Sequence, residues 1–184
     1  GKLIIVNSTS TIEVTSNIPK TMQNLQAEAI VKDTNGTILK DGEVIFKLDG
    51  VEVATGMIRN GKAKISYRLP TTVIGGEHKL TAELHNEYYD INSTDITVNV
   101  LKTDIKDMDI PSLTIKTLQN STIDIVIDDE FSTQLKENVD VEVFIDEKSI
   151  LNTTTNMAVL DVEIPIHGYM AGVHNITYKV KESN

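Results

Sequence analysis

The sequence has no cysteine or tryptophan, and aromatic residues make up only 4% of its 184 positions. The lack of cysteine excludes disulfide scaffolds and cysteine-ligated metal sites. With so few aromatic side chains, the core must consist mainly of Val, Ile and Leu, which favour strands over helices. There is also no apolar run long enough for a membrane helix, so no membrane insertion is expected.

Positive charge is scarce as well, because 27 acidic residues outnumber 17 Lys and Arg and give a net charge of −10. A protein that binds phosphate backbones needs a positive surface, so nucleic acid is excluded as a partner. The sequence has no Gly-x-Ser-x-Gly motif, no phosphate-binding glycine loop and no pair of histidines spaced for zinc. We therefore expect neither an enzyme nor a bound cofactor.

What the sequence does contain is a period-two alternation of apolar and polar residues, typical of half-buried strands. Glycine-containing turn signals separate the alternating runs, and no window has helical spacing with caps. The runs of the first half cover residues 27–31, 44–48, 63–69, 80–84 and 96–100. The turn signals are Asn35-Gly36, Asp41-Gly42, Asp49-Gly50, Asn60-Gly61 and Gly75-Gly76. This half is predicted to be all-β.

The second half repeats this pattern at an offset of about 96 residues, which predicts a tandem pair. Residues 123–127 answer 27–31, residues 141–145 answer 44–48, and residues 172–177 answer 76–81. Residues 158–164 are matched to 63–69, with Pro165 matched to Pro70. We predict two tandem immunoglobulin-like β-sandwich domains, residues 1–101 and 102–184, joined by a short charged linker over residues 102–111.

The second domain lacks a counterpart of the last strand, which in the first domain covers residues 96–101. Residues 3–6 form a spare apolar segment ahead of the first domain. The unpaired edge beside residues 173–180 is a hazard for pairing with another chain, so edge-strand self-association is expected. Because the chain starts and stops abruptly, we expect it to be part of a longer protein whose export signal and anchor lie elsewhere.

The run from Gly42 to Gly50, then Gly61-x-Ala63, then Gly75-Gly76-x-His78-x-Leu80-Thr81-Ala82 resembles the prokaryotic Ig-like repeat domains of long surface proteins. The Asn/Thr-rich, cysteine-free composition is most similar to that of the adhesin-like proteins of methanogenic archaea. The family's aromatic position after the sixth strand matches Tyr88 or Tyr89. The second domain departs from the pattern, because Asp146-Glu147 replaces Asp-Gly. The resemblance implies an extracellular, surface-exposed spacer or adhesive module.

Six Asn-x-Ser/Thr sequons lie along the chain, and they make it a candidate glycoprotein. The first candidate acceptors are Asn35, which lies in a predicted turn, and Asn152, because acceptors must be exposed; Asn92 and Asn120 are further candidates. The alternative is that the abundance of Asn and Thr alone creates the motif.

His78 and His174 occupy equivalent positions of the two repeats, each two residues before a core position. Because the two would lie in separate sandwiches, they cannot share a metal, and we expect each to make a hydrogen bond that orders a loop. Tyr89 is expected to close one end of the first sandwich with its ring. All three are therefore interpreted as structural residues.

The linker carries Asp104, Asp107 and Asp109, and calcium between tandem β-domains is one hypothesis for these carboxylates. Their spacing matches no known calcium loop, and the alternative is a solvated acidic linker.

The interpretation that follows is a structural repeat of a cell-surface adhesin, whose partner is a protein or glycan of a host or neighbouring cell. The alternatives are a binding module that uses its end loops, or an accessory domain of a surface glycoside hydrolase.

Overall fold

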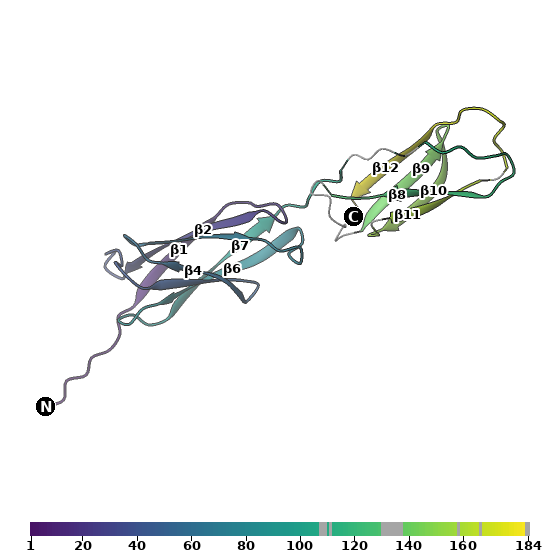
Figure 1. The fold of residues 1–184 in the computed structure, drawn as a ribbon. Helices are drawn as coiled ribbons and strands as arrows, with labels where there is room; N and C mark the ends of the chain where they lie inside the picture. The colour runs from purple at the N-terminus through teal and green to yellow at the C-terminus, as the bar shows by residue number, and fades with distance from the viewer. Residues whose placement is uncertain (107–109, 111, 130–137, 158, 166, 183–184) are drawn as a thin grey trace. The chain divides into compact units, whose positions relative to one another are not determined.

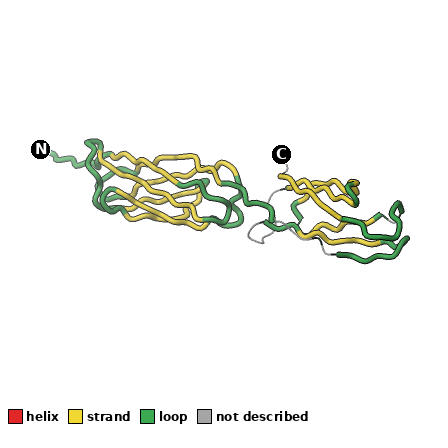
Figure 2. The backbone as a smooth tube through the Cα atoms, turned by 90° about the horizontal axis from the view of Figure 1, so that it is seen from above, coloured by secondary structure: helices red, strands yellow, loops and turns green. Residues whose placement is uncertain are grey.

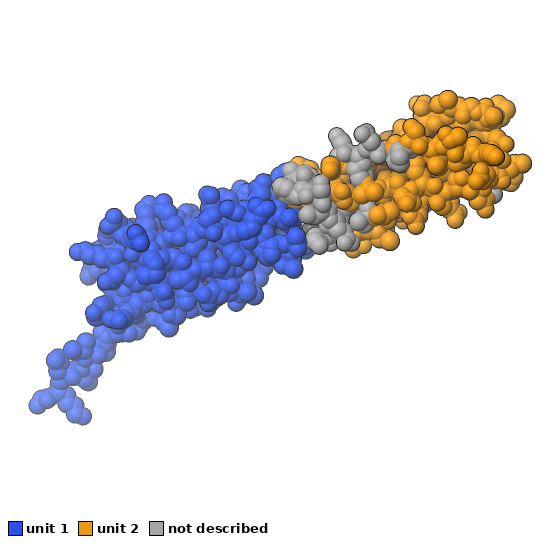
Figure 3. Space-filling model, viewed as in Figure 1, with its two compact units in different colours: residues 1–102 blue, residues 103–184 orange. Residues whose placement is uncertain are grey.

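A computed structural model describes residues 1–184 apart from 107–109, 111, 130–137, 158, 166 and 183–184. Within the described part, all regular secondary structure is strand and none is helix (Figure 2). The chain divides into two compact units, Gly1–Lys102 and Thr103–Asn184, coloured separately in Figure 3. The all-β prediction of two tandem Ig-like β-sandwiches is confirmed.

Unit 1 is a sandwich of a three-stranded sheet, in the order β1-β2-β5, and a four-stranded sheet, in the order β4-β3-β6-β7 (Figure 1). All pairs within these sheets are antiparallel. The fourth strand pairs with the third, whereas in a constant-type immunoglobulin domain it belongs to the other sheet. The strands are β1 (Ser10–Ser16), β2 (Asn24–Asp33), β3 (Glu43–Leu48), β4 (Val51–Met57), β5 (Lys62–Arg68), β6 (Gly76–His85) and β7 (Asn92–Val100).

The core of unit 1 is formed by the inward-facing residues of strands in which buried and more exposed positions alternate. On β3, Val44, Phe46 and Leu48 are buried while the residues between them are not. Leu80, Ala82 and Leu84 on β6 are completely buried, and Val98 and Val100 on β7 face the same interior. Phe46 is the one aromatic residue among the largest fully buried side chains of the described chain. Aliphatic packing therefore holds the sheets together, as the low aromatic content predicted.

Unit 2 has the same arrangement, with fewer strands among its described residues, in a β11-β8 sheet and a β10-β9-β12 sheet. Its strands are β8 (Ser121–Val126), β9 (Val139–Ile145), β10 (Lys148–Thr155), β11 (Val159–Ile164) and β12 (Ile176–Glu182). Comparison of the strand order matches β8 to β2, β9 to β3, β10 to β4, β11 to β5 and β12 to β6.

The sequence register of the fifth strand needs a correction. Ala63 lies opposite Ala29 in unit 1, and Leu160 lies opposite Ile125 in unit 2. Leu160 therefore matches Ala63, two residues away from the match made from the sequence, and Pro165 is not the counterpart of Pro70. A shift of two residues leaves every side chain on the same face, so the alternation alone could not reveal it.

Part of the predicted linker also belongs to unit 2. Ile105 forms a β-bridge with Asp129, and Ile105 and Ile110 both pack against the second core. Because acidic residues surround these two apolar positions in the sequence, the composition of the segment indicated a charged linker.

Candidate functional site

The most regular polar feature of the molecule begins in a tight turn between β3 and β4. Asp49 and Gly50 form the two-residue loop, with φ of 50° and 83°. Positive φ at both positions is typical of a type I′ turn, which favours Asp-Gly. The turn points the Asp49 carboxylate at the start of β6. There Oδ1 accepts a hydrogen bond from the backbone N–H of Lys79 at 2.9 Å, and Oδ2 lies 2.7 Å from Nδ1 of His78.

The second ring nitrogen of His78 lies 2.8 Å from the carbonyl oxygen of Ile74. A carboxylate and a carbonyl are both acceptors, so only the imidazolium, with a proton on each nitrogen, satisfies both contacts. Partial burial opposes that charge, but the hydrogen bonds to Asp49 and Ile74 outweigh it and raise the pKa of His78. The contact with His78 in turn lowers the pKa of Asp49.

Unit 2 repeats this arrangement atom for atom. Asp146 Oδ2 lies 2.5 Å from His174 Nδ1, and Nε2 lies 2.8 Å from the carbonyl oxygen of Met170. Asp146 Oδ1 accepts from the backbone N–H of Asn175 at 2.9 Å. The hydrogen bond to Asp146 raises the pKa of His174, and that to His174 lowers the pKa of Asp146. We call each Asp-His pair with its carbonyl acceptor an Asp-His clasp, since it ties the β3–β4 turn to β6 and the β9–β10 turn to the residues just ahead of β12.

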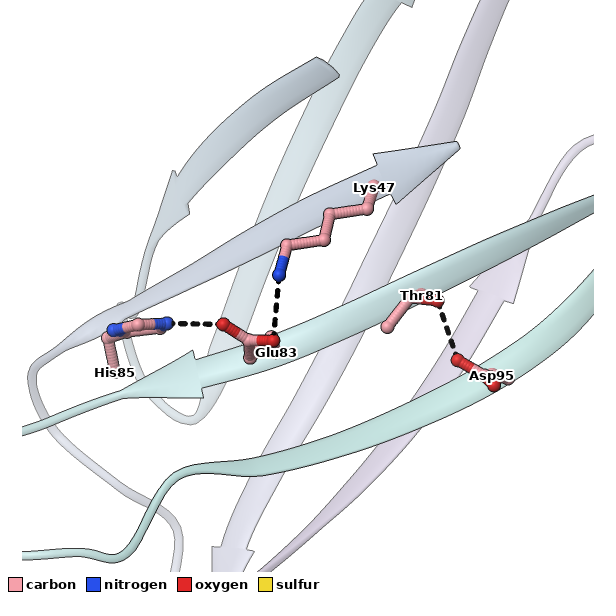
Figure 4. A network of polar contacts seen from close by, with 5 residues as sticks. All are labelled: Lys47, Thr81, Glu83, His85 and Asp95. Carbon is pink, nitrogen blue, oxygen red and sulfur yellow. Dashed lines mark hydrogen bonds and ion pairs between the residues drawn. The ribbon is translucent and has the colours of Figure 1, made fainter. Parts of the chain in front are cut away.

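The outer face of the four-stranded sheet carries a polar network that the sequence analysis did not identify (Figure 4). Lys47 Nζ lies 2.8 Å from Glu83 Oε2, and His85 Nε2 lies 2.7 Å from Glu83 Oε1. These contacts with Lys47 and then His85 lower the pKa of Glu83. Beside them, Thr81 Oγ1 donates to Asp95 at 2.6 Å. The outward parity of these positions on neighbouring strands is the signal that could have found them. Each group is already satisfied by its neighbour, as in an ordinary cross-strand surface.

The two terminal strands of unit 1, β1 and β7, lie side by side and run parallel, and we call their contacts the β1–β7 clamp. At one end, the Ser8 N–H donates to the Tyr88 carbonyl and the Asp90 N–H to the Ser8 carbonyl, each at 2.9 Å. At the other end, the Leu101 N–H donates to the Pro19 carbonyl at 2.8 Å and the Thr21 N–H to the Leu101 carbonyl at 2.9 Å.

Two side chains of β7 complete the β1–β7 clamp between those ends. Asn92 Nδ2 donates to the Ser10 carbonyl at 2.6 Å, and Thr94 Oγ1 donates to the Ile12 carbonyl at 3.0 Å. The clamp joins the two sheets at their edges, where the ladders within each sheet do not reach. The chain therefore enters unit 1 at one end of the sandwich and leaves it at the other (Figure 1).

The sequon asparagines differ in their availability. Asn35 is exposed in a turn fixed by hydrogen bonds from the N–H groups of Asn35 and Thr37 to Asp33 Oδ1, and Asn120 and Asn152 are exposed as well. Asn92 is half-buried, and its amide is occupied by the β1–β7 clamp. A glycan at Asn92 would compete with that bond, so the other three are the better acceptors.

Of the linker carboxylates, Asp104 lies in the described part and takes part in a contact there, whereas Asp107 and Asp109 lie outside it. Among the residues that the structure describes, no group of three or more His, Asp or Glu side chains is placed to hold a metal ion. Tyr89 is half-buried and packs against the first core, while Tyr88 is exposed. No helix in the described ranges is long and apolar enough to cross a membrane.

No model of a known protein family matches the sequence, and no curated protein is similar to it. Solved structures with similar folds include fibronectin(III)-like modules of Clostridium thermocellum CbhA, matched over 94% of this chain and 86% of theirs at 14% identity, with a TM-score of 0.34. A tetra-tandem repeat from the extending region of a large adhesion protein matches over 96% of this chain at 16% identity, with a TM-score of 0.49. A calcium-stabilised adhesin with which an Antarctic bacterium binds ice matches over 97% of this chain at 13% identity, with a TM-score of 0.33.

The chain spans 46% and 49% of the length of the last two proteins. Similarity at this level does not identify a function for this chain.

Proposed function

We propose that this chain is a non-catalytic, load-bearing repeat of an extracellular surface protein, acting as a spacer or stalk for adhesion. The β1–β7 clamp carries the proposal. Because β1 and β7 run parallel and the chain enters and leaves at opposite ends, a pull on the two ends of unit 1 slides one strand along the other. In that geometry the clamp contacts are loaded together, whereas an antiparallel hairpin pulled from its open end loses them one at a time.

The Asp-His clasp of unit 1 supports the same role away from the terminal strands. It fixes the β3–β4 turn against β6 through Asp49, whose own N–H also donates to the Lys79 carbonyl at 2.8 Å. Its recurrence at Asp146 and His174 keeps the same turn in both units. In a repeat protein, each unit gains stability from contacts within itself, and the Asp-His clasp is such a contact.

The extracellular location, the adhesive target and the glycans are further parts of the proposal. The net charge of −10 and the absence of cysteine suit an acidic surface protein that needs no disulfide staples. The exposed acceptors Asn35, Asn120 and Asn152 suit glycosylation. The resemblance to archaeal adhesin-like repeats suggests the source, and a protein or glycan on another cell is the expected partner.

Single-molecule force spectroscopy on the full chain tests the load-bearing role. Thr94→Val removes the hydroxyl that bonds the Ile12 carbonyl while keeping the shape of the side chain. Thr81→Val is the matched control, because its hydroxyl bonds Asp95 within one sheet and not across the clamp. We expect Thr94→Val to lower the unfolding force of unit 1 more than Thr81→Val does, after correction for their equilibrium stabilities. Equal losses of force in the two variants would refute the clamp as the load-bearing element.

A further inference from the structure

Two asparagines of this chain, Asn35 and Asn60, are each followed by glycine. An asparagine in this setting is reactive, because glycine has no Cβ to keep its backbone nitrogen away from the side-chain carbonyl carbon of the preceding residue. Both pairs lie in turns, with φ of 86° at Gly36 and 74° at Gly61. The fold nevertheless places the two pairs in very different surroundings.

The Asn35-Gly36 pair lies in the loop between β2 and β3, where residues 34–38 are all exposed. A Cβ built on Gly36 would meet no described atom within 4 Å, so the glycine is surrounded by open space. Its N–H donates to the Asp33 carbonyl at 3.1 Å, and the N–H groups of Asn35 and Thr37 donate to Asp33 Oδ1 at 2.9 and 2.8 Å. These bonds all end on one residue at the base of the loop, so the loop can open without disturbing the core.

The Asn60-Gly61 pair lies in the turn between β4 and β5, and there the glycine is buried. The Gly61 N–H donates to the Leu39 carbonyl at 2.9 Å, and the Gly61 carbonyl accepts from the Val31 N–H at 2.8 Å. Leu39 and Val31 both belong to the first core, and a Cβ built on Gly61 would lie 2.7 Å from the Cβ of Ile38. The nitrogen of Gly61 therefore cannot leave its hydrogen bond unless neighbouring core residues move as well.

We propose that Asn35 is a site of spontaneous deamidation in the folded chain, and that the fold protects Asn60 from the same reaction. The Gly36 nitrogen loses its proton to hydroxide and attacks Cγ of Asn35, and the bond from Cγ to the side-chain nitrogen breaks. That nitrogen takes up a proton from water and leaves as ammonia, and a five-membered succinimide ring remains.

Water then opens the ring at one of its two carbonyl carbons. Cleavage between Cγ and the Gly36 nitrogen gives aspartate. Cleavage between the backbone carbonyl carbon of residue 35 and that nitrogen gives isoaspartate, in which the main chain runs through Cγ. Overall, one water is consumed and one ammonia is released, with no change of oxidation state.

Both products change the loop. Each of them removes the sequon at position 35 and adds a carboxylate to the turn that Asp33 already holds. Isoaspartate also lengthens the main chain of the turn by one carbon, so the N–H groups of residue 35 and Thr37 cannot both keep their bonds to Asp33 Oδ1. The exposed loop therefore changes its charge and shape with the age of the molecule.

The two asparagines can be compared in one sample of the full chain, kept at pH 8 and 37 °C in native buffer or in concentrated guanidinium chloride. Cleavage after glutamate yields peptides 29–43 and 53–77, each with a single asparagine. Mass spectrometry follows the replacement of the side-chain NH2 by OH, and an isoaspartate-specific methyltransferase identifies the isoaspartate product.

In guanidinium chloride we expect Asn35 and Asn60 to react at similar rates, because both precede glycine. In native buffer Asn35 should stay within about tenfold of that rate, because its loop opens locally. Asn60 should slow by about a hundredfold or more, since that protection requires only part of the free energy that stabilises a folded domain. Similar native rates at the two residues, or products without isoaspartate, would overturn the proposal.

Two variants test the route and the protection separately. Gly36→Ala should slow the reaction at Asn35 in guanidinium chloride and leave Asn60 unchanged, because the added Cβ hinders the attack on Cγ. Leu39→Ala removes a buried side chain from the residue that binds the Gly61 N–H, so it should speed the native reaction at Asn60 and leave Asn35 nearly unchanged. An unchanged rate at Asn35 in Gly36→Ala would exclude the succinimide route, and an unchanged rate at Asn60 in Leu39→Ala would exclude protection by the core.

Discussion

Exchanging one residue between two matched turns measures how much backbone strain unit 2 stores. Glu147 occupies the second position of the β9–β10 turn with φ of 67°, where unit 1 has Gly50 with φ of 83°. A side chain in the left-handed region costs about 1–2 kcal/mol. Replacing the side chain by glycine offsets about 0.5–1 kcal/mol of this gain, because glycine has more conformational freedom to lose when the chain folds. Glu147→Gly should therefore stabilise unit 2 by about 0.5–1 kcal/mol, and raise its melting temperature by about 2–8 °C for a domain of this size.

The reciprocal change, Gly50→Glu, should destabilise unit 1 by a similar amount. A Cβ at Gly50 meets no atom within 4 Å, so this substitution tests the backbone conformation without a steric clash. Glu147→Gln is the control for loss of charge, and we expect it to leave stability nearly unchanged. Thermal melting followed by circular dichroism gives the shift, and residue-resolved hydrogen exchange assigns it to a unit. If Glu147→Gly were neutral while Gly50→Glu destabilised unit 1, turn strain would not explain the difference between the units.

Three further changes test other contacts. The native chain should melt at a lower temperature at pH 8.5 than at pH 5.5, and His78→Gln with His174→Gln should flatten that fall. Asp124→Lys should stabilise unit 2, since Asp124 faces Asp161 across the β8–β11 pair and the contact raises the pKa of Asp124. Thermal melting at pH 7 measures this, and the control Asp124→Asn should have a stability between those of the native chain and Asp124→Lys. Ser10→Ala should raise the stability of unit 1 by about 1 kcal/mol, because the buried Ser10 hydroxyl has no hydrogen-bond partner in the described residues; urea unfolding measures it.

The sign of the pH effect follows from the direction of each shift. The pKa of each clasp histidine is raised above its ordinary 6.5, so its stabilisation is complete below that pH and is lost as pH rises through the folded pKa. The pKa of each clasp aspartate, Asp49 and Asp146, is lowered below 3.8, so its stabilisation is present above 3.8 and is lost as pH falls through the folded value. Both contributions are therefore complete only between these two ordinary values. A native chain that melts at the same temperature at pH 5.5 and 8.5 would contradict the charged clasp.

The opposite charges that Asp124→Lys would create already exist in unit 1. Glu28 lies opposite Lys64 on β5, with 2.9 Å between Lys64 Nζ and Glu28 Oε2. Lys64 and then Lys62 lower the pKa of Glu28, the reverse of the effect at Asp124. A decrease in stability for Asp124→Lys would show that the facing carboxylates are not the source of strain.

Alternation predicted the strands whose inward face is fully buried, such as β2, β3 and β6. It missed β1, β4 and β10. Val51 to Met57 of β4 bury only Gly56 completely, so the period of two is too weak to detect there. The equivalence of His78 and His174 was visible from the repeat, but their aspartate partners lie almost thirty residues away. Only the fold brings Asp49 and Asp146 to them, so the complete clasp could not be read from local spacing.

The contacts that hold β1 against β7 connect residues 82 positions apart, from Ser10 to Asn92 and from Ile12 to Thr94. β1 can therefore contact β7 only after nearly all residues of unit 1 are present. A chain threaded N-terminus first through a narrow export channel would keep this sandwich open until Leu101 has emerged. Folding of the unit would then be delayed until its final strand has left the channel. The chain would cross the channel unfolded, and folding on the far side would pull the polypeptide outward.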